Sequence, residues 1–294
     1  SATKSPNPES PLAYEAALEL ADKVNADIVI TTDPDCDRLG VAARDSNGTL
    51  KLMTGNQSGA VLIEYILSTH RSRGTMPERA VMVNTIVTSD LGDRICESYG
   101  VKVEKTLTGF KFIGERIARH LAMHDANYVF GYEESYGCLI GDFVRDKDAV
   151  QASLMLCEAA AYYKEHGKTL IDVLGELYAR FGFYLDTQSN FFFRGADGQK
   201  KIAALTAGLR REHPTEVAGA KLKRMEDYTS EETQAEGFPS SDVLRFVFND
   251  GCWVAVRPSG TEPKCKFYYC VRADDEAAAK EKLAALKAAF EPRD

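Results

Sequence analysis

Residues 79–107, RAVMVNTIVTSDLGDRICESYGVKVEKTL, indicate the fold of the middle of the chain. The apolar run at 79–87 has the length and the β-branched composition of a buried strand. Residues 91–100 show helical spacing and end at a glycine, which is typical of helix C-termini. A second strand is predicted at 101–107. A strand, a helix and a further strand in this order predict a parallel βαβ unit.

The same alternation continues on both sides of this segment. Helices are predicted at 59–70, 109–124 and 148–167, and a strand is predicted at 127–132. Repeated βα units of this kind predict a parallel sheet with helices on both of its faces. The alternation ends near residue 185.

The two ends of the chain have different patterns. Near the N-terminus, a helix is predicted at 8–24, a buried strand at 26–32 and a hairpin turn at Ser46-Asn47-Gly48. The last third is richer in strands, which are predicted at 187–193, 220–228, 242–248, 252–258 and 266–272. Helices at 198–211 and 275–290 flank these strands, and Asn249-Asp250-Gly251 predicts a hairpin between two of them. We therefore expect an α/β fold in which a parallel-sheet βα domain is followed by a smaller α+β domain.

The composition excludes some classes of partner. A chain of 294 residues with 44% apolar and 27% charged residues has the composition of a globular protein of two or three domains. A net charge of -8 argues against nucleic acid or an anionic membrane as the main partner. Neither a signal peptide nor a membrane span is apparent. Seven cysteines without a CxxC pair predict free, mostly buried thiols in a reducing compartment, and hence a cytoplasmic protein.

Residues 31–40, TTDPDCDRLG, place three aspartates at alternate positions directly after the predicted strand. In extended backbone, alternate side chains face one side, so Asp33, Asp35 and Asp37 are expected to converge. Carboxylate oxygens suit Mg²⁺, and Arg38 would offset the excess negative charge. Two alternatives stay open. One is a solvated acidic turn, and the other is a phosphatase-like nucleophile at Asp33, although the DxDxT signature has Thr where this chain has an aspartate.

Residues 257–264, RPSGTEPK, predict a phosphate site in a loop between two strands. A glycine-containing loop can turn backbone N–H groups toward an anion. Arg257 adds a planar fork of donors, and Ser259 and Thr261 add hydroxyl groups. The alternative is a plain hairpin loop. No Walker motif and no GxGxxG motif support nucleotide binding.

Residues 131–137, GYEESYG, follow a strand of the parallel sheet. Ligands of such sheets bind at the carboxyl ends of the strands. Glu133, Glu134 and Ser135 offer acceptors for the hydroxyls of a sugar, whereas the alternative is an ordinary exposed loop.

Single residues elsewhere give weaker signals. Lys147 in RDKDA, and Thr108 and Lys111 in TLTGFK, are candidates for ligand contacts, although lysines in such positions are more often solvated. The five histidines form no metal-binding pair. His120 and His124 share a helix face without an obvious carboxylate ligand, so we expect them at the surface.

Together these motifs resemble the α-phosphohexomutase superfamily, which includes phosphoglucomutase and phosphomannomutase. DPDCDR resembles the magnesium loop of the family, GYEESYG its sugar loop and RPSGTEP its phosphate loop, in the family's order and spacing. TLTGFK and the EES form of the sugar loop are similar to the glucose-type branch. The resemblance covers essentially the whole chain.

The resemblance implies a role for each matching residue. Asp33, Asp35 and Asp37 would hold Mg²⁺ beside Arg38. Residues implied to bind the substrate are Thr108, Gly109, Lys111, Glu133, Ser135, Lys147, Arg257, Ser259, Gly260 and Thr261. The implied reaction interconverts hexose 1-phosphate and hexose 6-phosphate through a bisphosphate, with a glucose 1,6-bisphosphate-type primer.

The chain departs from the family at one point. Family members carry a phosphorylated serine in a TASHNP-like motif of their first domain, and this sequence contains no such motif. The resemblance therefore implies a C-terminal portion, with the tail of domain two at 1–50, domain three at 51–184 and domain four at 185–294. The missing N-terminal domains of the same polypeptide would be its partner, and we expect the chain to bind sugar phosphates without turning them over. A non-catalytic sugar-phosphate-binding module stays open. A phosphopentomutase also stays open, because glucose, mannose and pentose phosphates share the same hydroxyl contacts.

Overall fold

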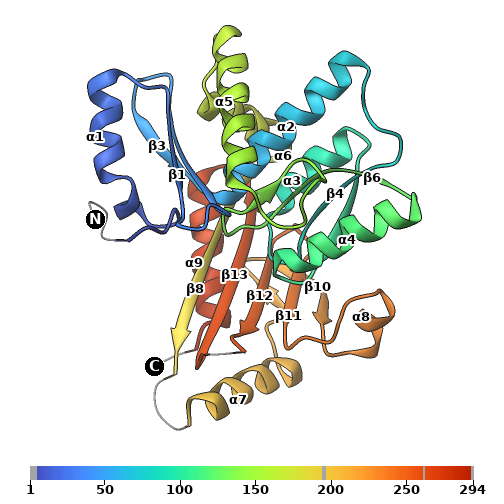
Figure 1. Cartoon of the computed structure of the whole chain (residues 1–294). Coiled ribbons are helices and arrows are strands. Elements are labelled where there is room, and N and C mark those ends of the chain that lie inside the picture. The colour runs from blue at the N-terminus through green and yellow to red at the C-terminus, as the bar shows by residue number, and fades with distance from the viewer. Residues whose placement is uncertain (1–4, 194–196, 261, 293–294) are drawn as a thin grey trace. The chain divides into compact units, whose positions relative to one another are not determined.

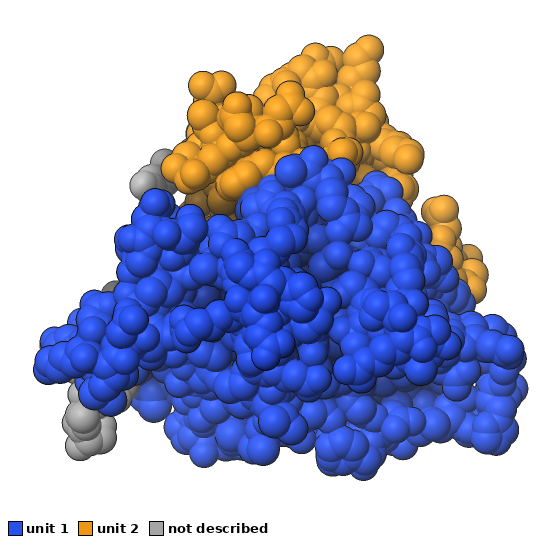
Figure 2. All heavy atoms as spheres, turned by 90° about the horizontal axis from the view of Figure 1, so that it is seen from above, with its two compact units in different colours: residues 1–181 blue, residues 182–294 orange. Residues whose placement is uncertain are grey.

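The structure is a computed structural model that describes residues 5–193, 197–260 and 262–292. The chain forms two compact units, residues 1–181 and residues 182–294 (Figure 2).

Unit 1 begins with a small antiparallel sheet in the order β1-β2-β3. Its strands are β1 (Ile28–Thr32), β2 (Leu39–Arg44) and β3 (Leu50–Met53). Helix α1 (Glu15–Val24) packs on this sheet through a core that includes Tyr14, Ala21 and Ala42. The helix starts later than predicted, because a 3₁₀ turn at Pro11–Ala13 precedes it. The predicted turn at 46–48 joins β2 and β3.

The larger sheet of unit 1 has the order β5-β4-β6-β7. Its strands are β4 (Ala80–Thr85), β5 (Lys102–Thr106), β6 (Asn127–Tyr132) and β7 (Cys138–Leu139). Strand β4 runs parallel to β5 and β6, which confirms the predicted βαβ unit, whereas β7 returns antiparallel. The crossover helices are α3 (Asp90–Ser98) and α4 (Phe110–Met123).

Helices cover both faces of this sheet (Figure 1). On one face, Val81 and Val83 of β4 pack against Phe110, Ile113 and Ile117 of α4. The other face meets α3 and α2 (Gly55–Arg73), which starts with a capping box. Helices α5 (Ala149–Glu165) and α6 (Leu170–Phe181) complete the unit. The carboxyl ends of the parallel strands, and the loops that follow them, lie at one edge of the sheet.

Unit 2 contains a six-stranded antiparallel sheet in the order β8-β13-β12-β11-β10-β9. The strands are β8 (Phe183–Phe192), β9 (Glu216–Val217), β10 (Ala220–Asp227), β11 (Leu244–Phe248), β12 (Trp253–Pro258) and β13 (Lys264–Ala273). The helices are α7 (Gly198–Arg211), α8 (Glu231–Ala235) and α9 (Glu276–Phe290). Residues from α7 and α9 share one apolar core with alternate residues of the central strands, as expected for a small α+β domain.

The prediction of surface histidines is wrong for His120, whose exposed fraction is 3%. Its Nδ1 lies 2.6 Å from Asp125 Oδ1, and its Nε2 lies 3.0 Å from Glu104 Oε2. The sequence concealed this arrangement because Glu104 is on a different element, strand β5. His124, by contrast, ends α4 in a left-handed conformation.

The prediction of free thiols is confirmed, since all seven cysteines fall in the described residues and none forms a disulfide. Five are buried, while Cys36 is half-buried and Cys157 is exposed. Within the described ranges, no helix has the length and apolarity that crossing a bilayer requires.

Candidate metal and sugar-phosphate sites

The three aspartates of the loop after β1 do converge. One carboxylate oxygen from each of Asp33, Asp35 and Asp37 lies within 4.8 Å of the other two. The backbone is not extended as predicted. It turns, since Cys36 N–H donates to Asp33 C=O at 3.1 Å and Cys36 has a left-handed φ of 59°. The turn, rather than strand alternation, therefore brings the carboxylates together.

Asp33 organises this turn. Its Oδ1 accepts the backbone N–H groups of Asp37 and Arg38 at 3.1 and 3.0 Å, and its Oδ2 accepts Arg38 Nε at 2.6 Å. Only 4% of the residue is exposed. Burial raises the pKa of Asp33, but the hydrogen bonds from Arg38 and Asp37 outweigh burial and lower the pKa to about 2. Asp33 is therefore a charged carboxylate whose oxygens already have donors.

Asp37 pairs with a lysine from a distant part of the chain. Lys147 Nζ lies 2.7 Å from Asp37 Oδ2. Burial and the neighbouring Asp33 raise the pKa of Asp37, although Lys147 opposes the rise. Burial lowers the pKa of Lys147, but its carboxylate neighbours raise the pKa overall. The pKa of Asp37 and the pKa of Lys147 are both raised, because one ammonium does not fully compensate the charge of the crowded carboxylates.

These residues fit a magnesium ion. Three carboxylates supply hard oxygen donors in one place, and a single Arg38 and a single Lys147 leave one negative charge without compensation. Mg²⁺ favours such a donor set and is usually bound by one or two carboxylates together with water and phosphate oxygens.

The loop at 133–137, which follows β6, is closed by a hydrogen bond from Glu133 N–H to Gly137 C=O at 2.9 Å. Glu133 Oε1 accepts the N–H of Gly109 at 2.9 Å. Gly109 has a φ of 122°, which favours glycine, so the loop after β5 can bring its N–H to this carboxylate. Burial raises the pKa of Glu133, whose exposed fraction is 5%, and Lys147 and the Gly109 hydrogen bond oppose the rise.

The metal loop (residues 33–38, leading into Leu39) and the sugar loop (residues 133–137) contact each other inside unit 1. Leu39 N–H donates to Tyr136 C=O at 2.9 Å, and Ala149 N–H donates to Cys36 C=O at 3.1 Å. Gly137 lacks a Cβ, and a Cβ there would overlap the side chain of Lys147. The structure thus brings the aspartates, Glu133 and Lys147 together in one region of unit 1.

The remaining candidates in unit 1 show fewer contacts. Thr108 Oγ1 is buried and has no hydrogen-bond partner among the described residues. Lys111 is exposed, and its Nζ lies 4.8 Å from the ring centroid of Phe112. Ser135 is half-buried beside Glu133.

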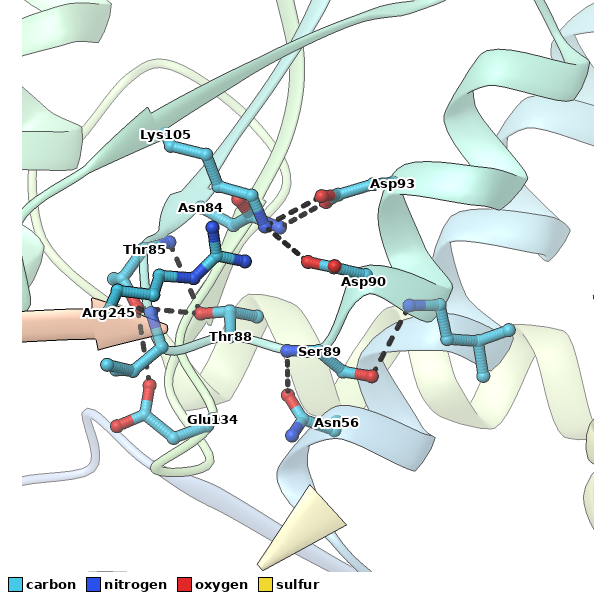
Figure 3. Close-up of polar contacts among 12 residues, drawn as sticks. Asn56, Asn84, Thr85, Thr88, Ser89, Asp90, Asp93, Lys105, Glu134 and Arg245 are labelled. Atoms are coloured by element: carbon cyan, nitrogen blue, oxygen red, sulfur yellow. Dashed lines mark hydrogen bonds and ion pairs between the residues drawn. The ribbon is translucent and has the colours of Figure 1, made fainter. Parts of the chain in front are cut away.

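Sequence reasoning missed a polar cluster at the carboxyl ends of β4 and β5 (Figure 3). Thr85 and Thr88 join their hydroxyls at 2.8 Å, and Thr85 Oγ1 lies 3.4 Å from Glu134 Oε2 in the sugar loop. Nearby, Lys105 Nζ lies 2.7 Å from Asp93 Oδ2 and 3.5 Å from Asp90 Oδ1. The sequence signal for this cluster was the set of polar residues in NTIVTSD, which begins inside an apolar strand and continues past its end.

The phosphate loop of unit 2 joins β12 to β13. Ser259 N–H donates to Lys264 C=O at 2.8 Å, and Ser259 Oγ accepts Glu262 N–H at 3.3 Å. Arg257 Nη1 lies 3.5 Å from Tyr268 Oη. A Cβ at Gly260 would meet nothing within 4 Å among the described atoms. Thr261 lies outside the described residues.

Lys266 is a further residue that the sequence reasoning missed. It is the direct cross-strand partner of Arg257, so both side chains belong to the same face of the sheet. Like charges opposite one another are destabilising unless an anion offsets them. The signal was the hairpin register, which pairs the first residue of RPSGTEPKCK with its last.

In comparisons with known proteins, three successive parts of the chain match domains of one family. Residues 1–48, 54–181 and 209–288 match the phosphoglucomutase/phosphomannomutase alpha/beta/alpha domain II, alpha/beta/alpha domain III and C-terminal domain, respectively. A phosphoglucomutase from one strain of Staphylococcus aureus is 40% identical over 295 residues, covering 97% of this chain and 52% of the relative. The corresponding enzyme from another strain is 42% identical over 289 residues, covering 94% and 51%. The chain spans about half the length of these curated relatives.

Solved structures share the fold. A Paramecium phosphoglucomutase, parafusin, in its open form aligns with a TM-score of 0.68 at 20% identity, covering 96% of this chain and 48% of that one. A putative phosphomannomutase from Thermus thermophilus aligns with a TM-score of 0.63 at 21% identity, covering 98% and 51%.

Proposed function

Because the chain belongs to the phosphoglucomutase/phosphomannomutase family, a family of enzymes, we propose that it provides the metal, sugar and phosphate sites for interconversion of hexose 1-phosphate and hexose 6-phosphate. The observation that carries the proposal is the convergence in unit 1 of three carboxylates, the Glu133 loop and Lys147. Hard oxygen donors beside a sugar-hydroxyl acceptor and the ammonium of Lys147 suit a phosphorylated sugar.

Asp33, Asp35 and Asp37 would hold Mg²⁺ in the metal loop. The bound ion would supply positive charge to offset the negative charge of a transferring phosphoryl group. Arg38 acts through Asp33, because it fixes that carboxylate by a hydrogen bond at 2.6 Å.

The sugar loop orients the substrate. Gly109 N–H occupies one oxygen of Glu133, which leaves the other oxygen to accept a sugar hydroxyl. Ser135, on the same loop, donates to or accepts from a neighbouring hydroxyl. Thr108, Lys111 and Lys147 line the substrate site, with both lysines as donors to phosphate.

The phosphate loop holds the phosphate that does not react. Arg257 supplies a bidentate fork, Ser259, Gly260 and Thr261 supply hydroxyl and backbone donors, and Lys266 adds a second cation opposite Arg257. Binding energy from this unreactive end positions the reactive phosphoryl group.

The phosphoryl donor lies outside these 294 residues. No TASHNP-like serine motif is present in the sequence, so we assign the phosphoserine to a domain of the same polypeptide that is not included here. A glucose 1,6-bisphosphate-type primer and a bisphosphate intermediate belong to that complete reaction. The alternative is a sugar-phosphate-binding module without turnover.

The finer assignments follow the motifs. TLTGFK and the EES sugar loop favour glucose phosphates, with phosphopentomutase activity as the alternative within the family. The domains are 1–50, 51–184 and 185–294, and the free thiols favour the cytoplasm. Arg38 and two backbone N–H groups hold Asp33 in one orientation and leave one lone pair of Oδ2 for the ion, which favours a fixed metal ligand over the nucleophile of a hydrolase.

Two measurements on the purified chain test the proposal. Glucose 1-phosphate with bisphosphate primer should give no glucose 6-phosphate, and conversion by a contaminant-free sample would overturn the assignment of the donor. Calorimetry should show Mg²⁺ binding that Asp35→Asn weakens. Asp27→Asn is the control, since Asp27 pairs with Lys164 at 2.7 Å away from the metal loop. Equal affinity in Asp35→Asn and the unchanged chain would rule out the metal site.

A further inference from the structure

We propose that Lys147 is a latch that couples the metal loop to the sugar-phosphate site, because its ammonium and a divalent cation compete for the carboxylate of Asp37. Cation binding releases Lys147, which then pairs with the phosphate of the substrate. The inference rests on the proposed function and adds to it an order of preference between the two ligands.

The contact itself is close and sheltered. Lys147 Nζ lies 2.7 Å from Asp37 Oδ2 and 3.3 Å from Asp146 Oδ1. The side chains of Lys147 and Asp37 are only 15% and 27% exposed. Solvent screens this pair less than a surface pair, so its formation and its loss both carry a measurable free energy.

Of the two cations that pair with the aspartates of the metal loop, Lys147 is the less restrained. The Arg38 guanidinium donates through two of its nitrogens. Its Nε donates to Asp33 Oδ2 at 2.6 Å, and its Nη1 donates to Glu9 Oε1 at 2.9 Å and to Asn7 Oδ1 at 3.2 Å. Lys147 has a long flexible side chain whose ammonium is paired with the carboxylates of Asp37 and Asp146. A divalent cation near three carboxylates repels both cations, and the less restrained one moves first.

The backbone around Lys147 is anchored, so its side chain can move alone. Asp148 caps α5 by accepting the N–H groups of Val150 and Gln151 at 2.9 and 3.0 Å. Asp148 N–H donates to Cys138 C=O at 3.0 Å, and the next residue donates to the metal loop at Cys36. The backbone from which the side chain starts is thus fixed to strand β7 and to the metal loop.

The path of the side chain crosses the sugar loop. A Cβ at Gly137 would overlap Lys147 Cδ, so the chain passes where only glycine leaves room. Its Nζ lies 5.8 Å from the ring centroid of Phe110, the first residue of α4 after the Gly109 loop. A small rotation of the distal torsions therefore moves the ammonium between the metal loop and the sugar loop.

A static bridge predicts the opposite result. If Lys147 only orients Asp37 for the metal, removing it weakens Mg²⁺ binding. If it competes, removing it strengthens Mg²⁺ binding. Coupling also requires reciprocity, so Mg²⁺ should tighten binding of the sugar phosphate by the same factor as the sugar phosphate tightens Mg²⁺.

The test compares Lys147→Met with the unchanged chain. Mg²⁺ is titrated while the amide shifts of residues 33–38 are followed, and Lys147→Met should bind it about three- to tenfold more tightly, as expected for loss of one partly buried like charge. Glucose 6-phosphate should bind the unchanged chain at least about fivefold more tightly with Mg²⁺ than without. In Lys147→Met this dependence should disappear.

Two further variants isolate the cause. Lys164→Met removes the same charge from unit 1, but its partner is Asp27 at 2.7 Å, so it should leave Mg²⁺ binding unchanged. Gly137→Ala keeps the ammonium and displaces it from Asp37, so it should strengthen Mg²⁺ binding as Lys147→Met does. It also provides the test if Lys147→Met fails to fold.

The outcomes separate the latch from the function. Unchanged or weaker Mg²⁺ binding in Lys147→Met and Gly137→Ala would overturn the latch and leave the metal site in place. If the amides of residues 33–38 do not respond to Mg²⁺ in any form of the chain, the metal site and the latch both fall.

Discussion

Tyr132 shows how single residues set the position of the sugar loop. It is buried and directly precedes Glu133. A Cβ at Gly59 of α2 would lie 2.6 Å from the Tyr132 ring, and a Cβ at Gly92 of α3 would overlap the Tyr132 hydroxyl. Both helices approach the end of β6 this closely only because these two positions are glycine.

We expect Gly59→Ala to destabilise the chain by about 1–3 kcal/mol, the usual cost of overpacking a core, despite the better helix propensity of alanine. Gly175→Ala in α6 is the matched control, since a Cβ there meets nothing within 4 Å among the described atoms. It should stabilise by about 0.4–1 kcal/mol. Urea unfolding measures both, and a gain in stability for Gly59→Ala would contradict the packing argument.

The sequence predicted that the three aspartates of the loop after β1 converge, but not the geometry by which they do so. Residue type alone shows that the loop can offer hard oxygen donors, from Asp33, Asp35 and Asp37. The left-handed φ of Cys36 and the turn it makes depend on hydrogen bonds to Asp33, and the Lys147 contact depends on a fold that joins residues far apart in sequence. Pattern reasoning has no access to contacts of that kind.

At the scale of elements, β5 is an edge strand with ion pairs on consecutive residues. Lys105 pairs with Asp93 and Asp90, and Glu104 pairs with Lys102 at 2.8 Å and with His120 at 3.0 Å. Consecutive strand residues point to opposite faces, so the pairs clamp β5 from both sides. The strand leads directly to the loop of Thr108 and Gly109, and the clamp therefore fixes where that loop starts.

Glu104→Gln should show a stability loss that depends on pH. Burial raises the pKa of Glu104, but hydrogen bonds from Lys102 and His120 outweigh it and lower the pKa overall. A carboxylate with a lowered pKa in the folded state stabilises fully above its unfolded pKa, about 4.3, and loses this as pH falls through the folded value. The variant should therefore be less stable by about 1.5–3 kcal/mol at pH 7 and by progressively less below about pH 4.3.

Denaturant unfolding at several pH values measures this difference. Glu97→Gln is the control, because Glu97 pairs with Arg94 at 2.9 Å on an exposed part of α3 and should change stability little. A loss for Glu104→Gln that stays constant from pH 7 to below pH 4 would show that the charge of Glu104 has no part in the clamp.

Elements with a strong periodic pattern were predictable. Strand β6 at 127–132 and helix α7 at 198–211 match their predicted ranges, because their apolar residues follow the spacing of a strand and of a helix. Helix α6 was missed, although Leu170, Val173, Leu174 and Leu177 have helical spacing and are buried. It follows another helix after a short turn, where the expected alternation would place a strand. The antiparallel β7 has two residues and leaves no pattern to detect.

For the whole molecule, unit 2 has what a separate folding unit requires. Its apolar core draws residues from α7, α9 and the strands of its own sheet. Strand β8, first in this unit, pairs with β13 along all ten residues and so ties the start of the unit to its end. We expect residues 182–294 to fold alone into a cooperatively unfolding domain, with dispersed amide resonances as the measurement.

If that domain folds, we expect the proposed phosphate loop to bind anions in the isolated domain and in the full chain alike. Arg257→Ala should weaken binding of inorganic phosphate roughly 10- to 150-fold, since a charge-assisted hydrogen bond contributes about 1.5–3 kcal/mol. Ser259→Ala should cost less, about 0.5–1.5 kcal/mol, because a hydroxyl forms a neutral bond. Arg257→Lys should recover only part of the affinity, since an ammonium does not form two parallel bonds.

Amide shifts of Arg257, Ser259, Gly260, Glu262 and Lys264 during a phosphate titration measure these affinities. Arg224→Ala is the control, because Arg224 is a cation of the same unit that pairs with Glu226 at 2.6 Å on strand β10. It should leave the affinity unchanged. If the loop amides stay still while others move, the loop is not the phosphate site. If the loop responds equally in Arg257→Ala and Arg224→Ala, the response follows the overall charge of the unit rather than the fork of Arg257 beside Lys266.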